Sequence, residues 1–191
     1  AAGKGTIARA LARHFGYHFL DTGTLYRRVG LAVLKSAGDA TEIARSLNDG
    51  PYDDAELRTE DVGAMASVVA SIPAVRQALL AYQREFAGRP PGAVLDGRDI
   101  GTVVCPAAQV KIYVTASPEV RAKRRWEELK SMGMEASLSA TLDEIRIRDE
   151  RDSNRAVAPL LPAPDATIID TSDMTIEAAV AAAVRVAGLA A

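Results

Sequence analysis

Short apolar segments alternate along this chain with longer amphipathic patterns, and this alternation restricts the fold more than any other feature. The apolar segments have the length of buried strands, and polar residues follow each of them at once. The expected strands are residues 17–20, 93–95, 110–114 and 167–169. The expected helices are residues 7–15, 25–34, 75–86, 119–130, 142–151 and 175–186. The order predicts an α/β fold in which helices flank a parallel sheet.

Parallel sheets of this kind bind ligands at the carboxyl ends of their strands. The residues at those ends are therefore the first candidates for a functional site. They read Asp21-Thr22-Gly23, Asp96-Gly97-Arg98-Asp99, Thr115-Ala116-Ser117 and Asp170-Thr171-Ser172. We expect the chemistry to lie at this edge of the sheet.

Length and composition indicate one globular domain. The chain has 191 residues, of which 48% are hydrophobic and 25% charged, so it is neither a disordered nor a membrane protein by composition. A net charge of −2 gives no sign of a nucleic-acid or membrane partner. The single cysteine, Cys105, excludes an internal disulfide and predicts a reducing, cytoplasmic location. We expect a monomer without a secretory signal or a membrane-spanning segment.

The alternation is interrupted between about residues 35 and 87. This stretch shows no clear strand, and it contains a polar, turn-rich segment at residues 48–54 followed by two helical runs. We expect a small inserted subdomain here, within a single domain that spans residues 1–191.

The chain opens with Gly3-Lys4-Gly5-Thr6 and continues directly into a helical pattern. This is typical of the second half of a phosphate-binding loop, G-x-x-x-x-G-K-[ST], except that glycine stands at the Ser/Thr position and Thr6 follows it. We expect the first glycine of the loop and its strand to precede Ala1. Such a loop turns backbone N–H groups toward an anion, while Lys4 adds charge and Thr6 offers a hydroxyl to Mg²⁺. The alternative is an ordinary helix start.

Two further strand ends carry arginines suited to a second phosphate. Thr22 and Arg27 lie in the polar helix start after the first strand, although Thr22 could only cap the helix and Arg27 could only face solvent. Asp96 and Arg98 follow the next strand, where a P-loop fold holds a carboxylate for Mg²⁺ or its waters.

Two basic clusters lie in the second half of the chain. Arg148, Asp152 and Arg155 recur at helical spacing and share one face, which is either a ligand face or a solvated, salt-bridged one. Arg121, Lys123, Arg124 and Arg125 form the other cluster. A pair of polyphosphate substrates would suit both.

Taken together, these segments resemble the cytidylate kinases of bacteria, a P-loop nucleoside monophosphate kinase family. The most specific strings are Asp-Gly-Arg-Asp-Ile-Gly-Thr-Val-Val at 96–104 and Asn-Arg-Ala-Val-Ala-Pro-Leu at 154–160. The resemblance implies transfer of a phosphoryl group from ATP to CMP or dCMP with Mg²⁺. It also implies a nucleotide-binding insertion at about 35–87, shorter than in longer members, and a short lid at about 121–155.

The resemblance also implies a role for individual residues. Those implied for ATP are Ala1, Ala2, Gly3, Lys4, Gly5, Thr6, Arg124 and Arg125. Those implied for CMP are Thr22, Tyr26, Arg27, Arg58, Ser67, Arg76, Asp96, Arg98, Asp99, Arg148, Asp152 and Arg155. Within the second set, Arg27, Arg98 and Arg155 would bind the phosphate, Arg148 and Asp152 the ribose, and Ser67, Arg76 and Asp99 the cytosine. Lys4, Arg98, Arg124 and Arg155 would act in catalysis, and Thr6 and Asp96 would hold Mg²⁺, partly through water.

No general base is needed for this reaction, because the acceptor phosphate is already ionised. Two alternatives remain open at this stage. The chain could be another P-loop small-molecule kinase acting on UMP or AMP, or a nucleotide-binding module without catalytic activity.

Overall fold

The computed structural model describes residues 2–48, 50, 52–131, 133–153 and 161–189, with the backbone alone at 148 and 151–153. Contacts within the chain divide it into two compact units. One unit is His18–Gly97, and the other combines Ala1–Tyr17 with Arg98–Ala191.

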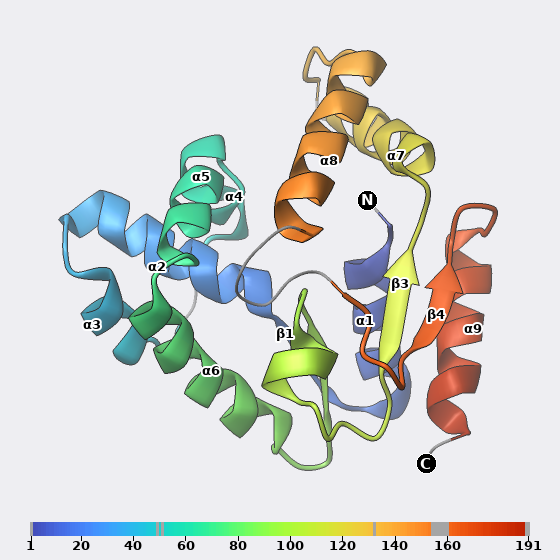
Figure 1. Ribbon diagram of the computed structural model, residues 1–191, viewed down its shortest axis with the longest axis horizontal. Helices are drawn as coiled ribbons and strands as arrows, with labels where there is room; N and C mark the ends of the chain where they lie inside the picture. Colours follow the sequence, from blue (N-terminus) through green and yellow to red (C-terminus); the bar gives the residue numbers. More distant parts are fainter. Residues whose placement is uncertain (1, 49, 51, 132, 154–160, 190–191) are drawn as a thin grey trace. The chain divides into compact units, whose positions relative to one another are not determined.

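The unit His18–Gly97 is a pair of parallel strands with five helices among its described residues (Figure 1). Its elements are β1 (His18–Asp21), α2 (Thr22–Ser36), α3 (Ala40–Arg45), α4 (Asp54–Leu57), α5 (Glu60–Val69), α6 (Pro73–Ala87) and β2 (Ala93–Asp96). Aspartates start three of these helices, because Asp21, Asp39 and Asp53 accept hydrogen bonds from N–H groups of the first turn. Pro73 occupies the first turn of α6, where its missing N–H costs nothing.

Apolar faces of α2, α5 and α6 form the core of this unit. Leu25 and Val29 of α2 are buried with Val69 of α5 and with Val75 and Leu79 of α6. Gly30 allows α2 to approach α5 closely, since a Cβ at this position would lie 2.9 Å from the backbone nitrogen of Ala66. The core therefore fixes α5, which carries one of the predicted base-reading residues, against α2.

The other unit contains a second parallel strand pair. Its elements are α1 (Lys4–Phe15), the short π-helix η1 (Ile100–Val104), β3 (Ile112–Thr115), α7 (Pro118–Ser131), α8 (Leu138–Ser153), β4 (Thr167–Asp170) and α9 (Ile176–Gly188). Strands β3 and β4 pair from Ile112↔Thr167 to Thr115↔Asp170. Helix α9 lies beside β4 and contacts α1, while α7 and α8 pack against each other (Figure 1).

Small side chains bring α1 and α9 together. Ile7, Leu11 and Ala12 of α1 are buried, as are Ala179 and Ala183 of α9. Gly16 ends α1 in the left-handed conformation with φ 67°, and its N–H bonds to the carbonyl of Ala12. This packing holds α1, whose N-terminal end carries the predicted phosphate loop.

All four predicted strands and all six predicted helices are present, with ends that differ by a few residues. The parallel direction of the strands is confirmed. Among the described residues, however, hydrogen bonds join the strands in two separate pairs, and no ladder links β1–β2 to β3–β4. The predicted insertion at 35–87 contains four helices, α3 to α6, where two helical runs were expected. Its boundaries and those of the lid stay predictions.

No single helix in the described ranges combines the length and the apolar character needed to cross a membrane. Helices α5 and α6 satisfy the length and composition criteria only as a pair, and their axes are bent by 98° at the break between them.

Candidate functional site

The predicted phosphate loop forms the start of α1. Gly3 has φ 82° and immediately precedes the helix, which begins at Lys4. This left-handed conformation strains any residue with a Cβ, so the backbone favours glycine at position 3. The first turn contains no acidic residue, and the side chain of Thr6 is exposed. N–H groups at the start of a twelve-residue helix, together with a lysine, form a surface suited to a phosphate group.

Arg124, predicted to lie over ATP, contacts the turn after β4. Its Nη1 donates to Oγ1 of Thr171 at 3.0 Å, and its Nη2 donates to the Thr171 carbonyl at 2.7 Å and to the Met174 carbonyl at 3.4 Å. Arg125 pairs with Glu128 at 2.8 Å on the exposed face of α7. The two arginines of the predicted lid therefore have different environments, one anchored to backbone carbonyls and one facing solvent.

Thr22 and Asp96 join the ends of β1 and β2. Thr22 is 4% exposed, and its hydroxyl donates to the carbonyl of Asp96 at 2.9 Å. Asp21, not Thr22, caps α2 by accepting from the N–H of Gly23. The Thr22 hydroxyl has one proton, and it is donated to Asp96. Toward a ligand the hydroxyl can therefore act only as an acceptor, whereas a phosphate oxygen needs a donor. Its position supports a structural role at the strand ends.

Arg27 reaches from α2 to the neighbouring helices. Its Nη1 donates to the carbonyl of Leu57 at 2.8 Å, and a Cβ at Gly63 would lie 3.4 Å from the same nitrogen. Ser67, one turn further along α5, donates to the carbonyl of Gly63 at 3.2 Å. Arg58 directly follows Leu57. These contacts bring three predicted CMP ligands, Arg27, Arg58 and Ser67, to one region of the unit.

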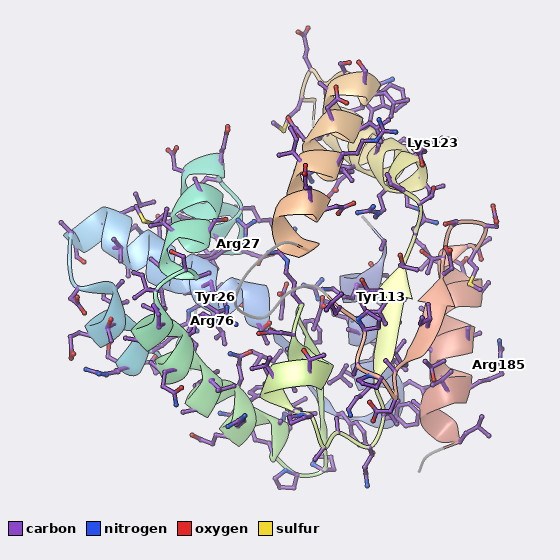
Figure 2. All side chains as sticks on the ribbon, in the orientation of Figure 1. Tyr26, Arg27, Arg76, Tyr113, Lys123 and Arg185 are labelled. Atoms are coloured by element: carbon purple, nitrogen blue, oxygen red, sulfur yellow. The ribbon has the colours of Figure 1, made fainter. Side chains whose placement is uncertain are left out.

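The remaining CMP candidates of this unit lie on α2, α6 and β2, and Arg58, which directly follows α4, makes a further contact described below. Tyr26 packs partly buried against the core, and Arg76 is half-buried in the first turns of α6 (Figure 2). Arg58 is exposed and bonds through Nε to Asp54 at 3.1 Å, as a pair one helical turn apart. Asp96 ends β2 opposite Asp21, with its side chain 7% exposed. A carboxylate buried to this degree requires specific stabilisation, such as positive charge.

Arg98 and Asp99 lie between β2 and η1, and both are half-buried. The backbone carbonyl of Asp99 accepts from the N–H groups of Val103 and Val104 at 2.8 and 3.1 Å, which opens η1. π-Helical turns of this kind are rare and often occur at functional sites. The family-like string at 96–104 thus adopts an irregular turn in place of a regular helix.

Helix α8 carries Arg148 and Asp152, of which the structure describes the backbone but not the side chains. Arg155 lies outside the described residues. The described part of α8 is attached to α7 by two ion pairs. Arg121 donates to both carboxylate oxygens of Asp149 at 2.8 and 2.6 Å, and Arg146 pairs with Glu119 at 3.1 Å. The hydrogen bonds that Asp149 accepts from Arg121 raise the pKa of Arg121 above its ordinary value.

Sequence reasoning did not identify Thr171 as a site residue. This threonine is 2% exposed, and its hydroxyl lies 3.0 Å from the carbonyl oxygen of Ala2 in the predicted phosphate loop. The only signal was its position in the strand-end string Asp170-Thr171-Ser172, which identifies an edge of a sheet and not a role. Arg121 was noted within a basic cluster, but its pairing with Asp149 was not foreseen.

Comparison with known proteins supports one family. The sequence model described as cytidylate kinase matches residues 1–188. A cytidylate kinase of Bradyrhizobium sp. (strain ORS 278) is 52% identical over 192 residues, covering 97% of this chain and 91% of that protein. A cytidylate kinase of Paramagnetospirillum magneticum is 52% identical with coverages of 98% and 93%, and one of Methylocella silvestris is 54% identical with coverages of 96% and 88%. The resemblance seen in short motifs extends over nearly the whole chain.

Proposed function

Because the chain belongs to the cytidylate kinase family, we propose that it transfers the terminal phosphoryl group of ATP to CMP or dCMP, giving ADP and CDP or dCDP. The observation that carries this proposal is the family match over residues 1–188, which includes the phosphate loop at the start of α1. The left-handed Gly3 and the helix start at Lys4 provide the local geometry that a phosphate-binding loop needs.

On the ATP side, the residues from Ala1 to Thr6 would bind the phosphates through backbone N–H groups and through Lys4. The ammonium group of Lys4 would stay close to the negative charge of the transferring phosphoryl group. Positioning and stabilisation of this charge are the main contributions that a protein makes to phosphoryl transfer. Arg124 and Arg125 would complete this half of the site from α7. Both lie within the predicted lid.

The oxygen donors of Thr6 and Asp96 suit Mg²⁺, which prefers oxygen ligands. Among the described residues, no group of three or more His, Cys, Asp or Glu side chains could hold a metal by itself. In phosphoryl-transfer sites Mg²⁺ is bound mainly by substrate phosphates and water, with one or two protein oxygens. When bound, Mg²⁺ supplies positive charge to the transferring phosphates. Thr6 and Asp96 would hold it, partly through water.

On the CMP side, Arg27, Arg98 and Arg155 would bind the phosphate and Arg148 and Asp152 the ribose. Ser67 and Arg76 would donate to the O2 and N3 acceptors of cytosine, whereas Asp99 would accept from its N4 amine. Thr22, Tyr26 and Arg58 would line the pocket. The acceptor phosphate needs alignment and charge neutralisation but no general base.

We further propose the P-loop kinase arrangement of this family, with parallel strands flanked by helices, an insertion at about 35–87 and a lid at about 121–155. The packing of α7 against α8 supports a lid formed by this helical hairpin. The regular elements of the insertion, where it is described, are helices joined by turns. The monomeric, cytoplasmic state belongs to the same proposal.

A parallel turnover assay tests the function. The protein is incubated with ATP and Mg²⁺ and with CMP, dCMP, UMP or AMP, and ADP formation is measured. We expect rapid turnover with CMP or dCMP, and at least tenfold lower kcat/KM with UMP and AMP, since one correctly placed polar reader contributes about 1–3 kcal/mol of discrimination.

A variant with Lys4→Ala serves as the control for a phosphoryl-transfer site. It should lose turnover and keep its melting temperature, because Lys4 lies at a helix start and not in the core. A preference for UMP or AMP would replace the proposal with another kinase activity. ATP binding without turnover on any acceptor would favour a nucleotide-binding module.

A further inference from the structure

Thr171 connects three segments that are far apart in the sequence. Its hydroxyl oxygen lies 3.0 Å from the carbonyl oxygen of Ala2 and 3.1 Å from that of Thr115, and it accepts from Nη1 of Arg124 at 3.0 Å. The first contact joins residues separated by 169 positions. A buried side chain that contacts the phosphate loop, the end of β3 and α7 is placed to hold them in one arrangement.

The single hydroxyl proton of Thr171 is best used on Ala2. The carbonyl of Thr115 already accepts from the backbone N–H of Thr171 at 2.8 Å, so it has a partner without the hydroxyl. Arg124 can only donate, so the Thr171 oxygen must accept from it. The Thr171 hydroxyl therefore donates its proton to the Ala2 carbonyl and accepts a hydrogen bond from Arg124.

The bond to Ala2 constrains the direction of a phosphate-binding N–H group. In a planar trans peptide, the carbonyl of one residue and the N–H of the next point in opposite directions. Holding the Ala2 carbonyl toward Thr171 therefore turns the N–H of Gly3 the opposite way. Gly3 has no side chain to hold this peptide plane, and the space around its Cα is open, with no atom within 4 Å of a Cβ position. The loop depends on a contact from outside for its order.

We propose that Thr171 is a positioning residue that orients the phosphate loop and anchors Arg124, so that its hydroxyl controls ATP affinity without touching ATP. This inference rests on the proposed function, because it assigns the loop to ATP. It predicts that loss of the hydroxyl impairs the ATP side of the reaction and spares CMP binding. A purely structural threonine would lower stability and leave the ratio of the two affinities unchanged.

Three variants separate these roles. Thr171→Val keeps the shape and removes the hydroxyl, whereas Thr171→Ser keeps the hydroxyl and removes only a methyl group. Thr175→Val is the matched control from the same turn, because Thr175 caps α9 by accepting from the N–H of Ala178 at 3.2 Å and has no described contact with the loop. Losing this cap should lower the melting temperature without changing the kinetics.

Calorimetric titration with ATP and Mg²⁺, and separately with CMP, gives the decisive measurement, together with KM for both substrates. We expect T171V to bind ATP about tenfold more weakly, the effect of about one lost hydrogen bond, with CMP affinity within twofold of wild type. T171S should bind ATP nearly as wild type does. The proposal is overturned if T171V loses the same affinity for ATP and for CMP. It is also overturned if T171V and T175V bind ATP equally well.

If T171V does not fold, the comparison of T171S with T171C decides, since a thiol is a far weaker donor than a hydroxyl. Equal ATP affinity in these two variants would then overturn the proposal. Failure of the proposed function is seen separately, as wild-type protein that binds ATP but does not phosphorylate CMP. The calorimetric test of Thr171 does not depend on turnover.

Discussion

Lys111 and Asp165 form an ion pair across 54 residues, with Nζ of Lys111 2.6 Å from Oδ2 of Asp165. The same ammonium group donates to the carbonyl of Pro106 at 2.6 Å. The Lys111 side chain is only 9% exposed, and its methylene groups lie against Gly101 of η1, where a Cβ would be 3.2 Å from Cδ of Lys111. This lysine therefore attaches the segment before β4 to the turn that follows Arg98 and Asp99.

Replacing Lys111 by methionine should keep the packing against Gly101 and remove both hydrogen bonds. We expect the free energy of unfolding to fall by about 1 kcal/mol, because Asp165 is 62% exposed and can be resolvated. Urea unfolding measures the change. Lys35→Met is the matched control, since its pair with Glu56 is exposed on both sides and should contribute less than about 0.5 kcal/mol. Equal losses in the two variants would contradict a special role for Lys111.

Low pH should lower the stability of the folded protein, partly by protonating Asp165. The hydrogen bond from Lys111 lowers the pKa of Asp165 below its ordinary value. A depressed folded-state pKa contributes stability above about pH 4, the ordinary range of an aspartate, and this contribution is lost as the pH falls through the folded-state value. Asp165→Asn and Lys111→Met should each flatten the fall in melting temperature between about pH 5 and 2. Slopes equal to that of wild type would show that acid acts at other groups.

Gly30 should resist substitution even though alanine is the better helix former. A Cβ here would lie 2.9 Å from the backbone nitrogen of Ala66, so Gly30→Ala must push α5 away from α2. We expect a loss of about 1–3 kcal/mol in urea unfolding, and a raised KM for CMP because Ser67 lies on α5. Gly188→Ala is the control, since the space around this helical glycine is open. It should be neutral or slightly stabilising, and a similar loss there would contradict the packing explanation.

The ion pair of Arg121 and Asp149 should stabilise the packing of α8 against α7 through its geometry as well as through its charge. Arg121→Lys keeps the positive charge but cannot donate to both carboxylate oxygens in parallel. We expect a loss of about 1 kcal/mol and a lower kcat, because α8 would be held less firmly against α7. A double-mutant cycle with Asp149→Asn isolates the coupling. The exposed pair Arg146 and Glu119 is the control, and its coupling should be much smaller because solvent screens both charges.

Asp99→Asn should reduce discrimination between CMP and UMP. An amide can turn either its oxygen to the N4 amine of cytosine or its NH₂ group to the O4 of uracil, whereas a carboxylate can only accept. We expect the ratio of kcat/KM values for CMP and UMP to fall by about tenfold or more, with KM for ATP unchanged. An unaltered ratio would place the reading of the base on other residues.

Local patterns in the sequence predicted much of the secondary structure and the family. The strand ends at Asp21 and Asp96 and the glycine before Lys4 depend on residues within a few positions of one another. Their conformations follow from short-range sterics and hydrogen bonding, so a single sequence is enough to recognise them. The string at 96–104 identified the family for the same reason, as a contiguous run of residues.

The partners of individual side chains were decided only by the tertiary structure. The Thr22 hydroxyl donates to the carbonyl of Asp96 because the ends of β1 and β2 lie side by side, and its contact with CMP stays a prediction. Thr171 reaches Ala2 only because β4 ends beside β3 and α9 packs on α1. These bonds join residues 74 and 169 positions apart, and their formation depends on how packed elements meet, which no local pattern contains. The sequence determined which residues are candidates for phosphate binding, and the packing of helices and strands decided which neighbouring groups their side chains bond to.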